Sequence, residues 1–137
     1  MSTPLVLLVE DDYRLCDTIS DLLQLLEIEY RVTQNATNSL ASLIALKPDL
    51  ILLDLPACRR GDHNIVTDIR LDFRLRQTKL VLIADDEYPD APKVRVADAV
   101  LKKPFLVGEL ESVLRRLLSQ YHHSEVMPPS ATFAPHA

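Results

Sequence analysis

The stretch LVLLVEDD (residues 5–12) decides the fold, because five consecutive apolar residues run directly into three carboxylates. A short apolar run without polar alternation is typical of a strand buried on both faces of a parallel sheet. The stretches DLILLD (residues 49–54) and AVLKKP (residues 99–104) repeat this arrangement, with an apolar run that ends in a charge. Carboxyl ends of neighbouring parallel strands lie along one edge of the sheet, where such folds bind ligands. The charges that end the three runs are therefore predicted to converge.

Between these runs the apolar pattern changes to helical spacing, so that strands and helices alternate along the chain. The third helix is predicted to begin after a cap at Asn64, and Pro89 and Pro92 confine the fourth helix to about residues 92–97. Five strands alternating with five helices predict an α/β fold, a doubly wound five-stranded parallel sheet of the flavodoxin-like kind, with strand order 2-1-3-4-5. The predicted strands are residues 5–9, 30–33, 50–53, 80–84 and 100–102.

The length of 137 residues suits one domain with a single core. We expect this domain to span residues 1–120 and to act as the functional unit. Residues 121–137 contain three prolines and little apolar patterning, which predicts a disordered tail or linker.

Composition narrows the function classes. The formal net charge of −5 disfavours direct binding of nucleic acid. A basic cluster that includes Arg70, Arg74, Arg76 and Lys79 lacks interleaved aromatic residues, and we interpret it as mostly solvated helix surface. No apolar stretch approaches the roughly 20 residues of a membrane-spanning helix. The absence of a signal-peptide pattern predicts a cytoplasmic protein without membrane contact.

Clustered carboxylates carry the chemistry. Glu10 and Asp11, brought beside Asp54, would repel one another unless a cation or a proton intervened. Mg²⁺ suits such a site, since it is usually held by one or two carboxylates, retained waters and a phosphate oxygen. An aspartate there can also attack a phosphoryl donor, while a lysine such as Lys103 neutralises the developing charge.

The motifs LLVEDD, PDLILLDLP and AVLKKPF, in this order on alternating strands and helices, resemble the receiver domain of two-component response regulators. The similarity runs from about residue 5 to residue 118. Members of this family accept a phosphoryl group from a sensor histidine kinase or a phosphotransfer protein and signal to a downstream protein target.

The resemblance implies a role for each residue that matches a motif. Asp54 would be the phosphoacceptor, and Lys103 would contact the phosphate. Asp11 would be the main Mg²⁺ ligand, with Glu10 as its water-mediated partner, and the backbone carbonyl of Pro56 would complete the metal shell. The family also implies a cis peptide bond between Lys103 and its following proline.

Two positions depart from the family pattern. The family has a threonine or serine at the end of the fourth strand, and this place falls on Ile83, which has no hydroxyl group. The aromatic residue that the family has three positions before the lysine is Val100 here. Both switch positions therefore lack the side chain that responds to phosphorylation in the family.

These observations favour a phosphoaspartyl signal receiver with an atypical switch, which catalyses at most its own phosphorylation and dephosphorylation. The alternative is a pseudo-receiver, a protein-interaction module that acts independently of phosphorylation. A cofactor-binding flavodoxin-like protein or a small enzyme ranks last, since neither Gly61 nor Gly108 lies in a phosphate-binding loop after the first strand.

Overall fold

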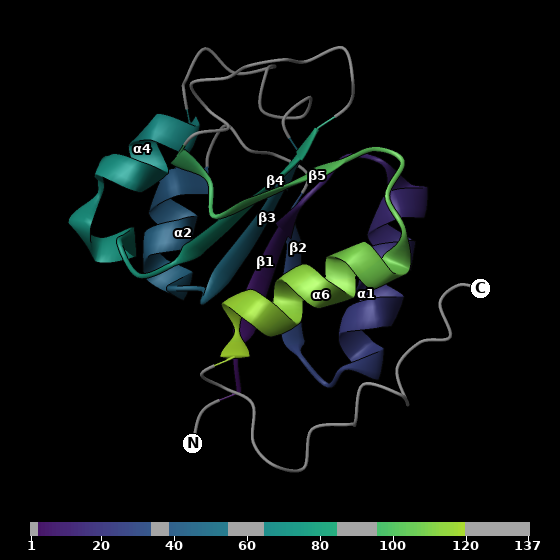
Figure 1. Cartoon of the computed structure of the whole chain (residues 1–137). Helices are drawn as coiled ribbons and strands as arrows, with labels where there is room; N and C mark the ends of the chain where they lie inside the picture. The colour runs from purple at the N-terminus through teal and green to yellow at the C-terminus, as the bar shows by residue number, and fades with distance from the viewer. Residues whose placement is uncertain (1–2, 34–38, 55–64, 85–95, 120–137) are drawn as a thin grey trace.

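A computed structural model describes residues 3–33, 39–54, 65–84 and 96–119 of the chain. Its centre is a five-stranded sheet in the order β2-β1-β3-β4-β5, in which every neighbouring pair is parallel (Figure 1). The predicted fold class and strand order are confirmed. The strands are β1 (Leu5–Val9), β2 (Glu29–Thr33), β3 (Leu50–Asp54), β4 (Lys79–Ala84) and β5 (Ala99–Lys102).

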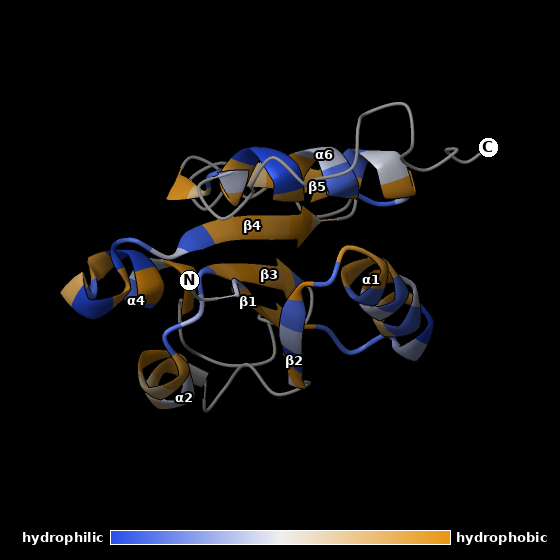
Figure 2. Ribbon diagram, turned by 90° about the horizontal axis from the view of Figure 1, so that it is seen from below, coloured by the Kyte–Doolittle hydropathy of each residue, from blue (hydrophilic) through white to orange (hydrophobic). Residues whose placement is uncertain are grey.

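Helices cover both faces of this sheet (Figure 2). They are α1 (Tyr13–Leu25), α2 (Ser39–Leu46), α4 (Ile65–Leu71), the 3₁₀ helix η1 (Phe73–Leu75) and α6 (Val107–Leu117). Helices α1 and α6 pack on one face, and α2, α4 and η1 on the other. The predicted cap Asn64, the tail and all but the last two residues of the predicted fourth helix lie outside the described residues. No helix in the described ranges is long and apolar enough to cross a membrane.

The apolar strand runs form two cores separated by the sheet. Successive side chains of a strand point to opposite faces, so Leu50 and Leu52 of β3 join the core under α1 and α6, whereas Ile51 and Leu53 join the core under α2 and α4. All four side chains are completely buried. This explains the absence of polar alternation in the central strands, since both of their faces are covered.

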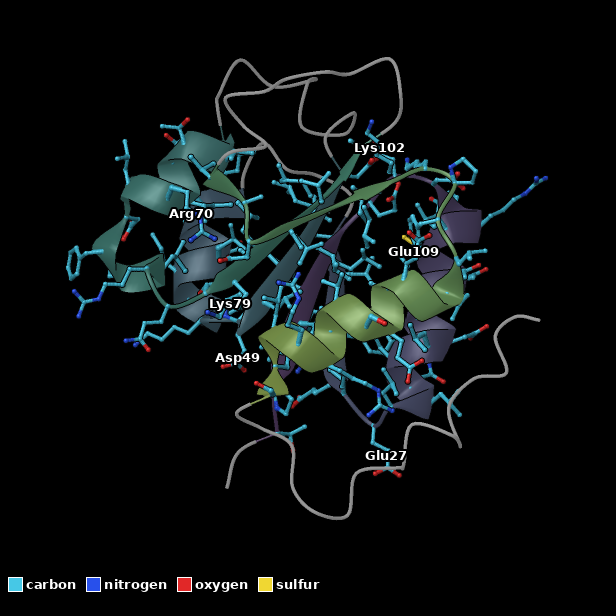
Figure 3. All side chains as sticks on the ribbon, viewed as in Figure 1. Glu27, Asp49, Arg70, Lys79, Lys102 and Glu109 are labelled. Carbon is cyan, nitrogen blue, oxygen red and sulfur yellow. The ribbon has the colours of Figure 1, made fainter. Side chains whose placement is uncertain are left out.

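Arg70 is an exception within the basic cluster, which the sequence indicated to be mostly solvated helix surface, because it is only partly exposed. Arg70 of α4 donates from Nη2 to the Thr78 carbonyl at 3.2 Å and to Asp98 Oδ2 at 3.1 Å. The same Asp98 oxygen accepts the Leu80 backbone N–H at 2.8 Å. Arg70 therefore fastens α4 to the segment that leads into β5. Figure 3 shows its side chain pointing from α4 toward the sheet.

Candidate functional site

Strand register brings the charged ends of the apolar runs together. Val9 pairs with Leu53 between β1 and β3, and Ala84 pairs with Lys102 between β4 and β5. The ladder continues one residue beyond two of these strands, because the backbone N–H groups of Glu10 and Lys103 bond to the neighbouring strands. Glu10, Asp54 and Lys103 thus lie at the carboxyl edge of the sheet. Figure 3 shows Lys102 at this edge and Asp49 at the opposite one.

Asp54 and Lys103 form a close ion pair. The distance from Lys103 Nζ to Asp54 Oδ1 is 3.1 Å, and the Asp54 side chain is only 4% exposed. Burial would lower the pKa of the Lys103 ammonium, but the charges of Asp54 and Glu10 outweigh burial and raise it. The lysine therefore stays protonated and holds a positive charge against the carboxylate of Asp54. Its peptide bond to Pro104 is cis, as the resemblance implied.

Glu10 is the least ordinary residue of the site. Its side chain is completely buried, Oε2 accepts the Asp12 backbone N–H at 3.2 Å, and Oε1 has no hydrogen-bond partner among the described residues. Burial, followed by the negative charge of Asp54, raises the pKa of Glu10 from 4.5 to about 7. The negative charge of an ionised carboxylate in this position is only partly neutralised by its neighbours near neutral pH. A bound cation or proton would stabilise it.

The other two acidic residues after β1, Asp11 and Asp12, differ from Glu10 in their exposure and contacts. Asp12 caps α1, since its Oδ1 accepts the backbone N–H of Arg14 at 2.9 Å and that of Leu15 at 3.4 Å. Such a cap satisfies donors that the first helical turn leaves free. Asp11 is partly exposed between Glu10 and the cap. Pro56, predicted to supply a carbonyl, lies outside the described residues.

The side chains at this site could supply only some of the ligands of a Mg²⁺ ion. Within the described ranges, no three histidine, cysteine or acidic side chains are gathered closely enough to hold a metal ion by themselves. Mg²⁺ does not need such a cage, because waters and a phosphate oxygen usually supply most of its ligands. The buried, unpartnered Oε1 of Glu10 beside Asp54 is the observation that fits a cation here.

Both predicted switch positions are apolar parts of the core. Ile83 pairs in register with Asp54 and is completely buried in the core under α1 and α6. Val100 pairs with Leu82 and packs, partly buried, against the other core. Ala84, which ends β4, also lacks a hydroxyl group. The last two residues of β4 therefore offer no hydroxyl to the site.

The structure adds features near the site that the sequence did not single out. The Cys16 thiol of α1 is buried and lies 3.5 Å from the backbone carbonyl of Glu10, and burial raises its pKa. A shallow cavity of about 380 Å³ lies beside Lys103, between the start of α1 and the start of α6, and Asp12, Arg14 and Phe105 contribute to its lining. No local pattern marks these residues, since the contacts depend on how α1 and α6 pack over the sheet.

No protein-family model and no curated protein sequence matches the chain. Solved structures do match. A chemotaxis response regulator of Vibrio cholerae superposes with a TM-score of 0.73 at 22% identity, covering 85% of this chain and 99% of its own.

Two receiver domains of histidine kinases match equally well. One, from Syntrophus aciditrophicus, has a TM-score of 0.73 at 22% identity and covers 96% of this chain and 99% of its own. The other, from Pseudomonas aeruginosa, is described with a magnesium ion coordinated in the active site cleft. It has a TM-score of 0.72 at 20% identity and covers 86% of this chain and 99% of its own. This chain therefore has the fold of the response regulator receiver domain.

Proposed function

We propose that this chain is a cytoplasmic signal receiver of a two-component system, in which Asp54 accepts a phosphoryl group from a sensor histidine kinase or a phosphotransfer protein. One observation carries the proposal: a buried aspartate lies 3.1 Å from a lysine ammonium, at the sheet edge where Glu10 is also buried. Burying two neighbouring carboxylates beside one partly exposed ammonium is costly for a purely structural site. The arrangement suits a site that gains further charge when it is used.

The reaction is a phosphoryl transfer to a carboxylate. An oxygen of Asp54 attacks the donor phosphorus, a new P–O bond forms, and the P–N bond to the donor histidine breaks, so that its electron pair stays on the imidazole. The ammonium of Lys103 stabilises negative charge on the phosphoryl oxygens. Glu10, Asp11 and Asp54 would hold Mg²⁺, which when bound neutralises the charge of the phosphoryl group.

The signal would leave the domain through protein contacts. A phosphoryl group adds negative charge and hydrogen-bond acceptors at the carboxyl edge, which can bias a neighbouring segment between two arrangements. Neither Ile83 nor Val100 can respond by a hydroxyl bond or by an aromatic rotation. The response therefore uses other residues, and a downstream protein target reads the resulting change.

The second candidate is a pseudo-receiver that binds its partner whether or not Asp54 is phosphorylated. The buried Ile83 beside Asp54 is the specific observation that favours it. The isoleucine side chain cannot donate a hydrogen bond to a phosphoryl oxygen, so that phosphorylation would change the conformation of β4 little.

Amide NMR spectra with Mg²⁺ and beryllofluoride, together with mass spectrometry after acetyl phosphate treatment, test the proposal. We expect a mass increase of one phosphoryl group in the wild type and none in Asp54→Asn. Asp17→Asn, a change at an exposed aspartate of α1, is the matched control and should react as the wild type does. Failure of the wild type to react would sink the phosphoacceptor proposal. Reaction with shifts confined to the neighbourhood of Asp54 would favour the pseudo-receiver.

A further inference from the structure

Two surfaces of the molecule combine large exposed apolar side chains with charged ones. The charges are positive on one surface and negative on the other. The first, which we call the basic patch, consists of three exposed residues, Leu71, Phe73 and Arg76, together with the half-buried Lys79. Leu71 and Phe73 are 79% and 75% exposed, the two highest values among the large apolar side chains of the described residues. Among the described residues, no acidic side chain pairs with Arg76 or Lys79. The patch is therefore apolar and positively charged in a chain whose net charge is −5.

Several contacts hold the backbone of η1, which carries Phe73 of the basic patch. Asp72 caps η1 by accepting the Arg74 backbone N–H at 2.9 Å, and it also binds the Arg74 guanidinium through both carboxylate oxygens at 3.0 and 2.9 Å. That guanidinium lies 5.9 Å from the centre of the Phe73 ring. Leu75, almost completely buried, anchors η1 in the core. Because these contacts hold the backbone, Phe73 cannot turn inward without breaking them. An apolar side chain on a fixed backbone is a favourable anchor for binding, since less conformational freedom is lost.

The second surface, which we call the acidic stripe, consists of Tyr13, Asp17, Asp21 and Leu25 on α1. The four residues are spaced four apart and lie on one slowly winding row of the helix. Tyr13 and Leu25 at its ends are 70% and 61% exposed, and the two aspartates between them are also exposed. No basic side chain in the described ranges pairs with either aspartate.

The two surfaces cannot meet within one molecule. Helix α1 packs on one face of the sheet, and α4 and η1 pack on the other. Figure 2 shows α1 and α4 at opposite sides of the molecule. We propose that the acidic stripe of one copy docks on the basic patch of a second copy. Such a head-to-tail contact does not close on itself, so it builds short linear assemblies.

The chemistry of the patch favours this occupant over two others. A membrane surface is disfavoured, because two cations and two apolar side chains give little attraction to lipid. Nucleic acid is disfavoured because the patch has one aromatic ring, and this ring already lies beside the Arg74 guanidinium. A second copy brings carboxylates and apolar side chains together, as the patch requires. The contact is small, so the association is weak and rapidly reversible.

Sedimentation equilibrium of the full chain tests the proposal, without phosphodonor or Mg²⁺, from micromolar to millimolar concentration. We expect the weight-average mass to rise with concentration to at least about twice that of one chain, and to fall at high salt because charges contribute to the contact. Two variants separate the surfaces. The stripe variant is Asp17→Lys with Asp21→Lys, and the patch variant is Leu71→Ser with Phe73→Ser. All four changes are at exposed side chains, so the fold should persist, as amide NMR spectra can verify.

Each variant alone should remain monomeric, whereas an equimolar mixture should form a one-to-one dimer and nothing larger. The mixture keeps one intact stripe and one intact patch, and this result also shows that both variants are folded. A wild type that stays monomeric up to millimolar concentration overturns the proposal. So does a stripe variant that associates like the wild type, since the contact would then join two like surfaces. Patch-dependent binding of a monomeric wild type to anionic phosphatidylserine vesicles would assign the patch to lipid instead. None of these outcomes depends on whether Asp54 accepts a phosphoryl group.

Discussion

Glu10→Gln should stabilise the protein above neutral pH, although it removes a residue of the candidate site. Glutamine is nearly isosteric with glutamate and never ionises, so it can accept the Asp12 N–H without bringing a buried charge close to Asp54. The rise in the pKa of Glu10 from 4.5 to about 7 measures the cost of that charge. Each tenfold change in proton affinity is about 1.4 kcal/mol, so the cost is about 3 kcal/mol.

The sign of the pH dependence follows from where the proton binds. Between about pH 4.5 and about pH 7 the folded protein keeps the Glu10 proton that the unfolded chain has lost. The folded state therefore binds more protons in this window, and the free energy of unfolding falls as the pH rises through it. Glu10→Gln has no such proton. We expect the difference in stability between the variant and the wild type to grow across this window and to become constant above it.

Urea unfolding of the metal-free protein at a series of pH values measures this difference. Glu27→Gln, a change at an exposed glutamate, is the matched control and should shift stability little at any pH. Mg²⁺ at about pH 8 should stabilise the wild type and should stabilise Glu10→Gln less, because binding to the folded state alone shifts the equilibrium. A variant that is less stable than the wild type at about pH 8, or a difference that does not change with pH, would refute the reasoning.

Three further changes test other parts of the structure. Lys103→Ala removes the cation 3.1 Å from Asp54 and should slow the reaction with acetyl phosphate on the order of 100-fold, measured by mass spectrometry; an unchanged rate would remove Lys103 from the mechanism. Leu52→Ala opens a cavity in the middle of the sheet and should cost about 3 kcal/mol of unfolding free energy in urea, and a cost below about 1 kcal/mol would contradict the described packing. Asp98→Ala leaves the Leu80 amide of β4 without its acceptor and the Arg70 guanidinium with only the Thr78 carbonyl, so stability should fall by about 2 kcal/mol and hydrogen exchange in β4 should accelerate; unchanged exchange would show that this contact does not hold the strand.

The strands and their order could be predicted because the sheet is buried on both faces. A strand such as β3 is then apolar at every position, and a charge at its end can only lie at the edge of the sheet. The convergence of Glu10, Asp54 and Lys103 follows from this rule and from the parallel topology. The second helix was also recognisable, since Leu40, Leu43 and Ile44 have helical spacing and Pro48 follows its end.

The electrostatic character of the site could not be predicted. The sequence resemblance gave the leading metal role to Asp11, but depth in the fold separates the acidic residues: Glu10 is completely buried, Asp11 is partly exposed and Asp12 caps a helix. These adjacent acidic residues differ because the backbone hydrogen bonds of the sheet continue to Glu10 and α1 begins soon after, and the sequence does not locate such a boundary to one residue. The Arg70 contact was missed for a similar reason, since its partner lies 28 residues away.

The buried thiol of Cys16 can report how often α1 separates from β1. Its Sγ lies against the Glu10 carbonyl under α1, and its raised pKa keeps it in the unreactive protonated form. An alkylating reagent can therefore modify it only during the fraction of time in which α1 lifts from β1. In a Cys58→Ser background, the rate of Cys16 alkylation would report the free energy of that opening directly, and its change on adding Mg²⁺ or beryllofluoride would show how strongly the occupied site holds α1 in place.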